Sequence, residues 1–261
     1  MASPGQSLFQ PINAFLTFTG ETCLILADAV KRLFRGRFEV AETINQMAFI
    51  GVASVPIVIL TGFFSGAVLS LYLSQFLGEY GATQFVGATV GLSVTREIGP
   101  VLAGIMVSAR CGSAMAAQLG SMAVTEQIDA LKMLSVHPTN FLVIPRVVAS
   151  VTMVPILAMV CMWSGVVGGL LVASMERVSA TTFMLSIERF VKPYDFLAGL
   201  IKAPFFGLII ALVACQQGMR TTQGAVGVGR ATTNTVVISM VLVYVANFVI
   251  ARFLFGAGQG P

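Results

Sequence analysis

The chain alternates long apolar segments with short polar connections. The apolar segments cover residues 47–77, 84–119, 141–173, 196–215 and 236–255. Each reaches or exceeds the length of about 20 residues that crosses a hydrocarbon core of about 30 Å. The pattern therefore predicts an all-α integral membrane protein with about five transmembrane helices. We expect a single domain over residues 1–261, with the transmembrane bundle at residues 45–258.

A weaker periodic pattern precedes the first span, over residues 8–38. Its apolar positions recur at steps of three, four or seven, which is typical of one stripe along a helix. The stripe comprises Phe9, Ile12, Leu16, Cys23, Ala27, Val30 and Phe34. Basic residues near its end suit anionic headgroups: Lys31, Arg32, Arg35 and Arg37. We expect an amphipathic helix in the membrane interface, with a soluble docking helix as the alternative.

The basic residues in the connections predict the orientation. With a cytoplasmic N-terminus, eight Lys and Arg residues fall on the inner side: Lys31, Arg32, Arg35, Arg37, Lys132, Arg146, Arg220 and Arg230. Four fall on the outer side: Arg177, Arg189, Lys192 and Arg252. The excess favours this orientation. The first ten residues lack a signal-peptide pattern, so we expect them to remain on the mature protein.

Composition supports the membrane class. Hydrophobic residues make up 56% of the chain and charged residues 10%, against about 25% charged in soluble domains. The net charge of +4 is spread over the connections rather than gathered in one patch, so we expect no nucleic-acid partner. The cysteines lie far apart in apolar surroundings, which predicts small buried hydrophobic residues and no metal site: Cys23, Cys111, Cys161 and Cys215.

The first span is unusually long. About 31 residues at about 1.5 Å each give about 46 Å, which exceeds the hydrocarbon thickness. Pro56 offers a place to bend, and the pair Gly62 and Gly66 allows another helix to approach closely.

The second span contains charged residues at mid-membrane depth. Arg96 and Glu97 come about 12 residues after its start, or about 18 Å into a regular helix. Charges at this depth usually face a bundle interior or a water-filled cavity. They either line a transport pathway or form structural ion pairs, for example with Lys202. Pro100 removes a helix hydrogen bond, so we expect a break nearby.

Small residues at every fourth position follow in the same span. Gly112, Ala116 and Gly120 form one smooth helix face, which favours close packing in a compact bundle and also suits a dimer interface. Between the third and fourth spans, residues 174–195 mix charged and apolar positions, which predicts a short amphipathic helix at the outer surface.

The inner connection over residues 122–134 is the most informative loop. Val124, Ile128 and Leu131 share one helical face, whereas Glu126 and Asp129 lie elsewhere. This pattern predicts a short amphipathic helix parallel to the membrane, either a docking element for a cytoplasmic partner or an ordinary connector. The sequence contains no P-loop and no protease or hydrolase motif, so an ATPase that drives transport would be another chain.

Three motifs in order resemble those of the MlaE/YrbE family of ABC-transporter permeases. They are residues 95–114 (TREIGPVLAGIMVSARCGSA), residues 122–131 (MAVTEQIDAL) and residues 227–237 (GVGRATTNTVV). The resemblance covers nearly the whole chain. It implies a homodimeric permease of the bacterial inner membrane that moves phospholipid or a related lipid to or from a periplasmic MCE-domain protein.

The resemblance also implies site residues. An ATPase subunit, which binds the ATP, would contact Thr125, Glu126, Gln127, Ile128, Asp129 and Leu131. The lipid pathway would include Leu69, Leu73, Phe76, Leu77, Tyr80, Arg96 and Glu97. No cofactor and no catalytic residue is expected in this chain. An ion-coupled carrier and a non-transporting scaffold are the alternative functions, and the lack of visible inverted halves weighs against the carrier.

Overall fold

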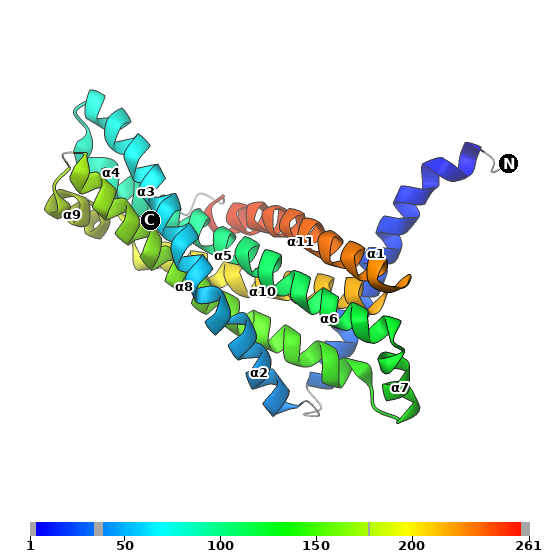
Figure 1. Cartoon of the computed structure of the whole chain (residues 1–261). Coiled ribbons are helices and arrows are strands. Elements are labelled where there is room, and N and C mark those ends of the chain that lie inside the picture. The colour runs from blue at the N-terminus through cyan, green and yellow to red at the C-terminus, as the bar shows by residue number, and fades with distance from the viewer. Residues whose placement is uncertain (1–3, 34–38, 177, 257–261) are drawn as a thin grey trace.

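The computed structural model describes residues 4–33, 39–176 and 178–256, and in these ranges it is helical without strands. Five helical stretches within them are long and apolar enough to cross a membrane: Val40–Glu79, Thr83–Val124, Thr139–Met175, Pro193–Met219 and Gly224–Phe255. The predicted all-α membrane fold is confirmed. The bundle is elongated, with α9 and the connection from α3 to α4 at one end and α7 at the other (Figure 1).

The α-helices follow one another as α1 (Pro4–Leu33), α2 (Val40–Ile50), α3 (Val55–Glu79), α4 (Val86–Ser93), α5 (Gly99–Val107), α6 (Ser113–Val124), α7 (Gln127–Met133), α8 (Ile144–Met175), α9 (Ala180–Phe190), α10 (Pro193–Met219) and α11 (Gly224–Phe255). Short 3₁₀ or π turns connect several of them: η1 (Val52–Ser54), η2 (Thr83–Phe85), η3 (Val94–Ile98), η4 (Ser108–Gly112) and η5 (Thr139–Val143). Helix α9 confirms the short helix predicted between the third and fourth spans.

The first span is interrupted near Pro56, where the sequence offers a place to bend. Helix α2 ends at Ile50, the 3₁₀ turn η1 follows, and α3 begins with Pro56 in its first turn. Arg110, from the second span, donates hydrogen bonds to the Phe49 carbonyl at 3.1 Å and to the Ser54 hydroxyl at 3.2 Å. A 3₁₀ turn therefore interrupts the regular helix, and the Arg110 guanidinium satisfies polar groups beside it.

Helices α3 and α8 pack with their backbones in contact. A Cβ atom added at Gly62 would meet the Cys161 carbonyl oxygen at 2.7 Å, and one added at Gly66 would overlap the Gly165 carbonyl. The predicted close approach at this glycine pair is confirmed. The face of small residues on the second span also packs against another helix of the same chain, since Gly112 faces Ile210 of α10.

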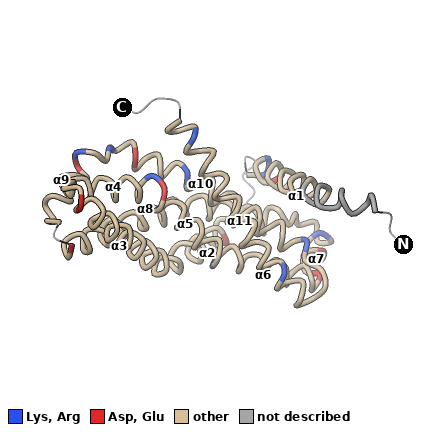
Figure 2. The backbone as a smooth tube through the Cα atoms, turned by 90° about the horizontal axis from the view of Figure 1, so that it is seen from above, with Lys and Arg blue, Asp and Glu red and all other residues tan. Residues whose placement is uncertain are grey.

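The core lies around α8 and α10, whereas α3 and α11 leave much of their surface open. Over the most apolar 18 residues of each helix, 56% are buried in α10, 28% in the first span and 11% in α11. Charged positions lie near α9 and near α7 at the two ends, and also in the middle of the bundle around α4, α8 and α10 (Figure 2). The exposed side chains of α3 and α11 include many large apolar ones, such as Phe64, Val68, Val245 and Phe248.

Helix α1 lies against the bundle at the α7 end and turns its predicted stripe away from it. Ala29 is buried against this end of the bundle, whereas Leu16, Cys23 and Val30 are exposed. The prediction that all four cysteines are buried is therefore wrong for Cys23, because a different face of α1 packs on the protein. An outward apolar stripe suits an interfacial helix. The predicted positions Phe34, Arg35 and Arg37 and the side chains of Phe9 and Ile12 lie outside what the structure describes.

A carboxylate helps to hold α1 in place. Burial raises the pKa of Asp28, but hydrogen bonds from Thr139 and Arg32 outweigh it and leave the pKa below its usual value. The ionised form therefore favours the folded state, and this contribution is lost as the pH falls through the lowered pKa. We expect Asp28→Asn to weaken α1 docking and to flatten the acid limb of the pH–stability curve, measured by thermal unfolding between pH 3 and pH 7. An unchanged acid limb would contradict this role.

Candidate functional site

Two acidic and two basic side chains meet inside the membrane-spanning part of the bundle. Arg96 and Glu97 come from the π turn η3, and Asp195 and Lys202 come from α10. Adjacent residues on a helix point about 100° apart, so Arg96 and Glu97 take different partners. The group contains two positive and two negative charges and is formally neutral, which makes its burial tolerable.

Lys202 lies at the centre of this group and is fully buried. Its ammonium donates to Glu97 Oε1 at 2.7 Å and to the carbonyl oxygen of Arg96 at 2.9 Å. In a regular α-helix that carbonyl would accept the N–H of residue 100, which Pro100 lacks. The regular α-helix is interrupted near Pro100 as expected, since the π turn η3 separates α4 from α5 and Pro100 lies in the first turn of α5. Lys202 supplies the donor that Pro100 lacks.

Arg96 forms the second pair. Its Nε donates to Asp195 Oδ1 at 2.8 Å, and the guanidinium lies 4.6 Å from the ring centre of Phe255. The other carboxylate oxygen, Oδ2, accepts the backbone N–H of Lys192 at 2.8 Å, so Asp195 also caps the start of α10. One carboxylate thus fixes both a helix terminus and an arginine of the second span.

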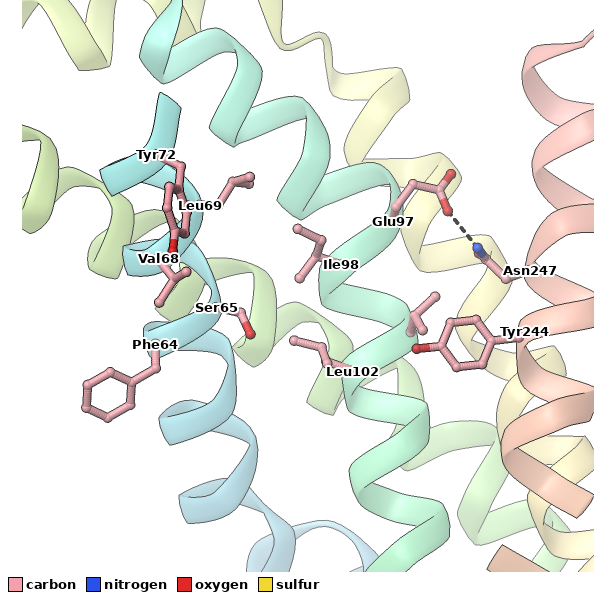
Figure 3. Close-up of a pocket in the computed structure, with 11 residues that line it drawn as sticks. Phe64, Ser65, Val68, Leu69, Tyr72, Glu97, Ile98, Leu102, Tyr244 and Asn247 are labelled. Carbon is pink, nitrogen blue, oxygen red and sulfur yellow. Dashed lines mark hydrogen bonds between the residues drawn. The ribbon is translucent and has the colours of Figure 1, made fainter. Parts of the chain in front are cut away.

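Glu97 connects this ion network to an open groove. Its Oε2 accepts a hydrogen bond from Asn247 Nδ2 of α11 at 2.7 Å, and its side chain is 42% exposed. The groove has a volume of about 690 Å³ and lies between α3, the stretch from η3 to α5, and α11 (Figure 3). It is lined by Phe64, Ser65, Val68, Leu69, Tyr72, Glu97, Ile98, Val101, Leu102, Tyr244 and Asn247. Its walls are largely apolar, with one carboxylate at the polar end.

The groove overlaps the predicted lipid pathway in part. Leu69 and Glu97 line it, whereas Arg96 is turned toward Asp195. The remaining predicted residues lie further along α3: Leu73 and Leu77 pack against a buried cluster, and Phe76 and Tyr80 are exposed with their rings 5.2 Å apart. Their role in a lipid pathway stays a prediction. The lining stripe at residues 64, 65, 68, 69 and 72 has helical spacing and could have been found in the sequence.

The predicted inner docking helix is shorter than expected. Helix α6 continues through Val124, and α7 covers only Gln127–Met133. Glu126 adopts φ 59°, a left-handed conformation that ends one helix and begins the next. Thr125 and Glu126 therefore lie in a turn rather than on a shared face. Ile128 is buried and Leu131 is half-buried, while the remaining predicted contact residues are exposed: Thr125, Glu126, Gln127 and Asp129.

These features define a polytopic helical membrane protein with an ion network beside a largely apolar groove. Residues 43–253 match the family model described as Permease MlaE. The chain is 40% identical over 242 residues to a probable ABC transporter permease of Rickettsia felis, covering 92% of this chain and 93% of the relative. It therefore belongs to the MlaE family of ABC-transporter permeases.

Chains from other organisms are also similar. A probable ABC transporter permease of Synechocystis is 38% identical over 253 residues, covering 96% of this chain and 94% of the relative. The chloroplastic protein TRIGALACTOSYLDIACYLGLYCEROL 1 of Arabidopsis thaliana is 35% identical over 238 residues, covering 90% of this chain and 68% of the relative. The family model matches parts of all five membrane-spanning stretches, so the resemblance seen in the sequence is confirmed.

Proposed function

We propose that this permease moves phospholipid or a related lipid, and that the groove between α3, α5 and α11 is where the lipid binds. The observation that carries the proposal is the polarity of the groove. Apolar and aromatic side chains form its walls, and Glu97 and Asn247 form its polar end, which is the arrangement an amphipathic ligand requires. The name of the Arabidopsis relative contains a glycolipid, which agrees with a lipid substrate.

A second copy of the chain would close the groove. Phe64 and Tyr72 on one wall and Tyr244 on the other are 58%, 67% and 57% exposed. Helix α11 also has the smallest buried fraction of the five spans. A homodimer that joins the open sides of α3 and α11 would cover these aromatic side chains and leave one continuous apolar cavity.

The energy would come from a separate ATPase that docks on α7. The exposed side chains of Gln127 and Asp129 lie at the end of the bundle that carries α1, and we assign this end to the cytoplasm. The opposite end, with α9, would face a periplasmic MCE-domain protein that exchanges lipid with the groove. The protein would then lie in the bacterial inner membrane with a cytoplasmic N-terminus.

The groove can be tested by filling it. Val68 lines the groove and is 51% exposed, so Val68→Trp should fold while occupying lipid space. We expect the purified variant to retain less than about half of the phospholipid that mass spectrometry finds with the wild type. Ile57→Trp places the same side chain at an exposed position of α3 outside the groove and should retain wild-type lipid. Equal lipid in both variants would refute the assignment of the groove.

Docking of the ATPase can be tested separately by charge reversal. We expect Glu126→Lys combined with Asp129→Lys to reduce co-purification of the proposed ATPase partner by about tenfold, because an interface of matched charge tolerates reversal poorly. Glu188→Lys, an exposed change on α9 at the other end, is the control and should co-purify normally. Undiminished association of the double variant would exclude this end of α7 as the docking element.

A further inference from the structure

A second cavity lies at the α7 end of the bundle, away from the groove. It has a volume of about 320 Å³ and lies where α10 turns into α11. Its wall contains two arginines, Arg220 and Arg230, together with the polar side chains of Thr222, Gln223 and Asn234. All residues that line it are described, and none of them is acidic. The cavity is therefore a positively charged pocket.

The third sequence motif, residues 227–237, builds this pocket. Gly227, Arg230 and Asn234 of the motif line it, and a Cβ at position 227 would overlap the Thr222 carbonyl. Glycine thus lets the preceding turn fold tightly onto the first turn of α11. No acidic residue lies in that first turn, and the side chain of the preceding Gln223 makes no capping hydrogen bond, so the partial positive charge of the helix start adds to that of the arginines.

An apolar groove continues from the pocket along α11. It has a volume of about 440 Å³ and shares Gln217 and Arg220 with the pocket. Beyond them it is lined by Phe18 of α1 and by Val237, Ile238, Val241 and Leu242 of α11. A basic pocket and an apolar groove are therefore contiguous, and both lie between helices at one end of the membrane-spanning bundle.

We propose that this composite site binds one anionic glycerophospholipid from the leaflet on the α7 side. The phosphate would occupy the basic pocket between Arg220 and Arg230, and one acyl chain would lie in the apolar groove beneath α1. Basic pockets between transmembrane helices suit anionic headgroups, and the adjoining apolar groove distinguishes a lipid from a free phosphate. The site is separate from the groove of the proposed transport function and does not depend on it.

One carboxylate already engages part of the site. Glu21 Oε2 lies 3.3 Å from Arg220 Nε and accepts a hydrogen bond from Gln216 Nε2 at 3.0 Å. Arg230 donates to the neutral Gln223 Oε1 at 3.5 Å, and its charge is not matched by an acidic side chain in the wall of the pocket. Since Glu21 belongs to α1, a phosphate beside Arg220 would join α1 to α10 and α11 through a shared arginine.

The test measures lipid binding to the purified full chain by native mass spectrometry. The probes are phosphatidylglycerol, phosphatidylcholine and glycerol phosphate. We expect phosphatidylglycerol to bind about tenfold more tightly than phosphatidylcholine, and glycerol phosphate to bind negligibly. Arg230→Gln should weaken phosphatidylglycerol binding several-fold, and Arg220→Gln combined with Arg230→Gln should weaken it by about tenfold or more. Lys132→Gln removes an exposed cation at the same end and should change nothing.

Two further controls distinguish loss of lipid binding at this site from loss of protein stability and from binding in the transport groove. Because Arg220→Gln also removes the contact with Glu21, Arg230→Gln alone must show the effect in a chain with wild-type thermal stability. Val68→Trp blocks the transport groove, and the variant protein should still bind phosphatidylglycerol at the composite site. Wild-type affinity in the double arginine variant would overturn the proposal. Equal binding of glycerol phosphate would also overturn it, since the pocket would then hold a free anion.

Discussion

Replacing Glu97 by leucine is expected to lower the free energy of unfolding by about 3–5 kcal/mol, because the fully buried ammonium of Lys202 would lose its countercharge. The Arg96 carbonyl and the Phe255 ring, whose centre lies 5.6 Å from the ammonium, would remain as partners, and neither carries a negative charge. The hydrogen bond from Asn247 would be lost as well. Equilibrium unfolding in mixed detergent micelles, followed by circular dichroism, measures the difference.

Two further variants test whether the unpaired ammonium of Lys202 causes the loss of stability. Glu97→Leu combined with Lys202→Leu removes both charges and should recover part of the lost stability, since an apolar pair can replace a buried ion pair while the Arg96 carbonyl loses its donor. Asp129→Leu breaks the exposed pair with Lys132 and should cost less than about 1 kcal/mol. If the double variant is as unstable as Glu97→Leu, the unpaired ammonium is not the cause.

Gly66→Val is expected to destabilise the bundle by about 3 kcal/mol or more, or to prevent folding, because the added side chain would overlap backbone atoms of Gly165. A flexible side chain could move aside, but a carbonyl in the middle of α8 cannot do so without displacing the helix. The yield of monodisperse protein and its midpoint of thermal unfolding measure the effect.

The control for this substitution lies on the same helix. A Cβ added at Gly78 meets no atom within 4 Å. Gly78→Ala should therefore be neutral or stabilise the protein by up to about 1 kcal/mol, as expected when glycine is replaced in a helix. Wild-type stability of Gly66→Val would show that α3 and α8 are further apart than the structure has them.

The spans could be predicted from the sequence because hydrophobic length alone determines them. Their ends could not, since polar residues continue several helices beyond the apolar core. Helix α11, for example, begins at Gly224, whereas the apolar pattern begins at residue 236. The division of residues 122–134 into the end of α6 and a short α7 could not be predicted either. A single left-handed residue, Glu126, separates the two helices, and hydrophobic periodicity carries no information on that backbone angle.

The candidate site could be predicted only where a residue is unusual for its surroundings. Arg96 and Glu97 stand out in an apolar span, and Lys202 is the other charge within an apolar span that the sequence offers as an ion-pair partner. Asp195 falls in a connection by its sequence, and nothing local marks it as the partner of Arg96, which lies 99 positions earlier in the chain. The groove depends on how three helices meet, so its lining from α11, Tyr244 and Asn247, required the tertiary structure.

The ion network also determines how the helices can move. Arg96 and Glu97, adjacent in sequence, are fastened to Asp195 and Lys202, which lie seven residues or about 10.5 Å apart along α10. Because these two ion pairs lie at different heights along α10, α10 cannot slide past the second span by even one turn, about 5.4 Å, without breaking both. The second span and α10 are therefore held as one rigid unit, and the backbone contacts at Gly62 and Gly66 hold α3 against α8. Any relative movement at the groove would fall on α11, which has the smallest buried fraction among the five spans.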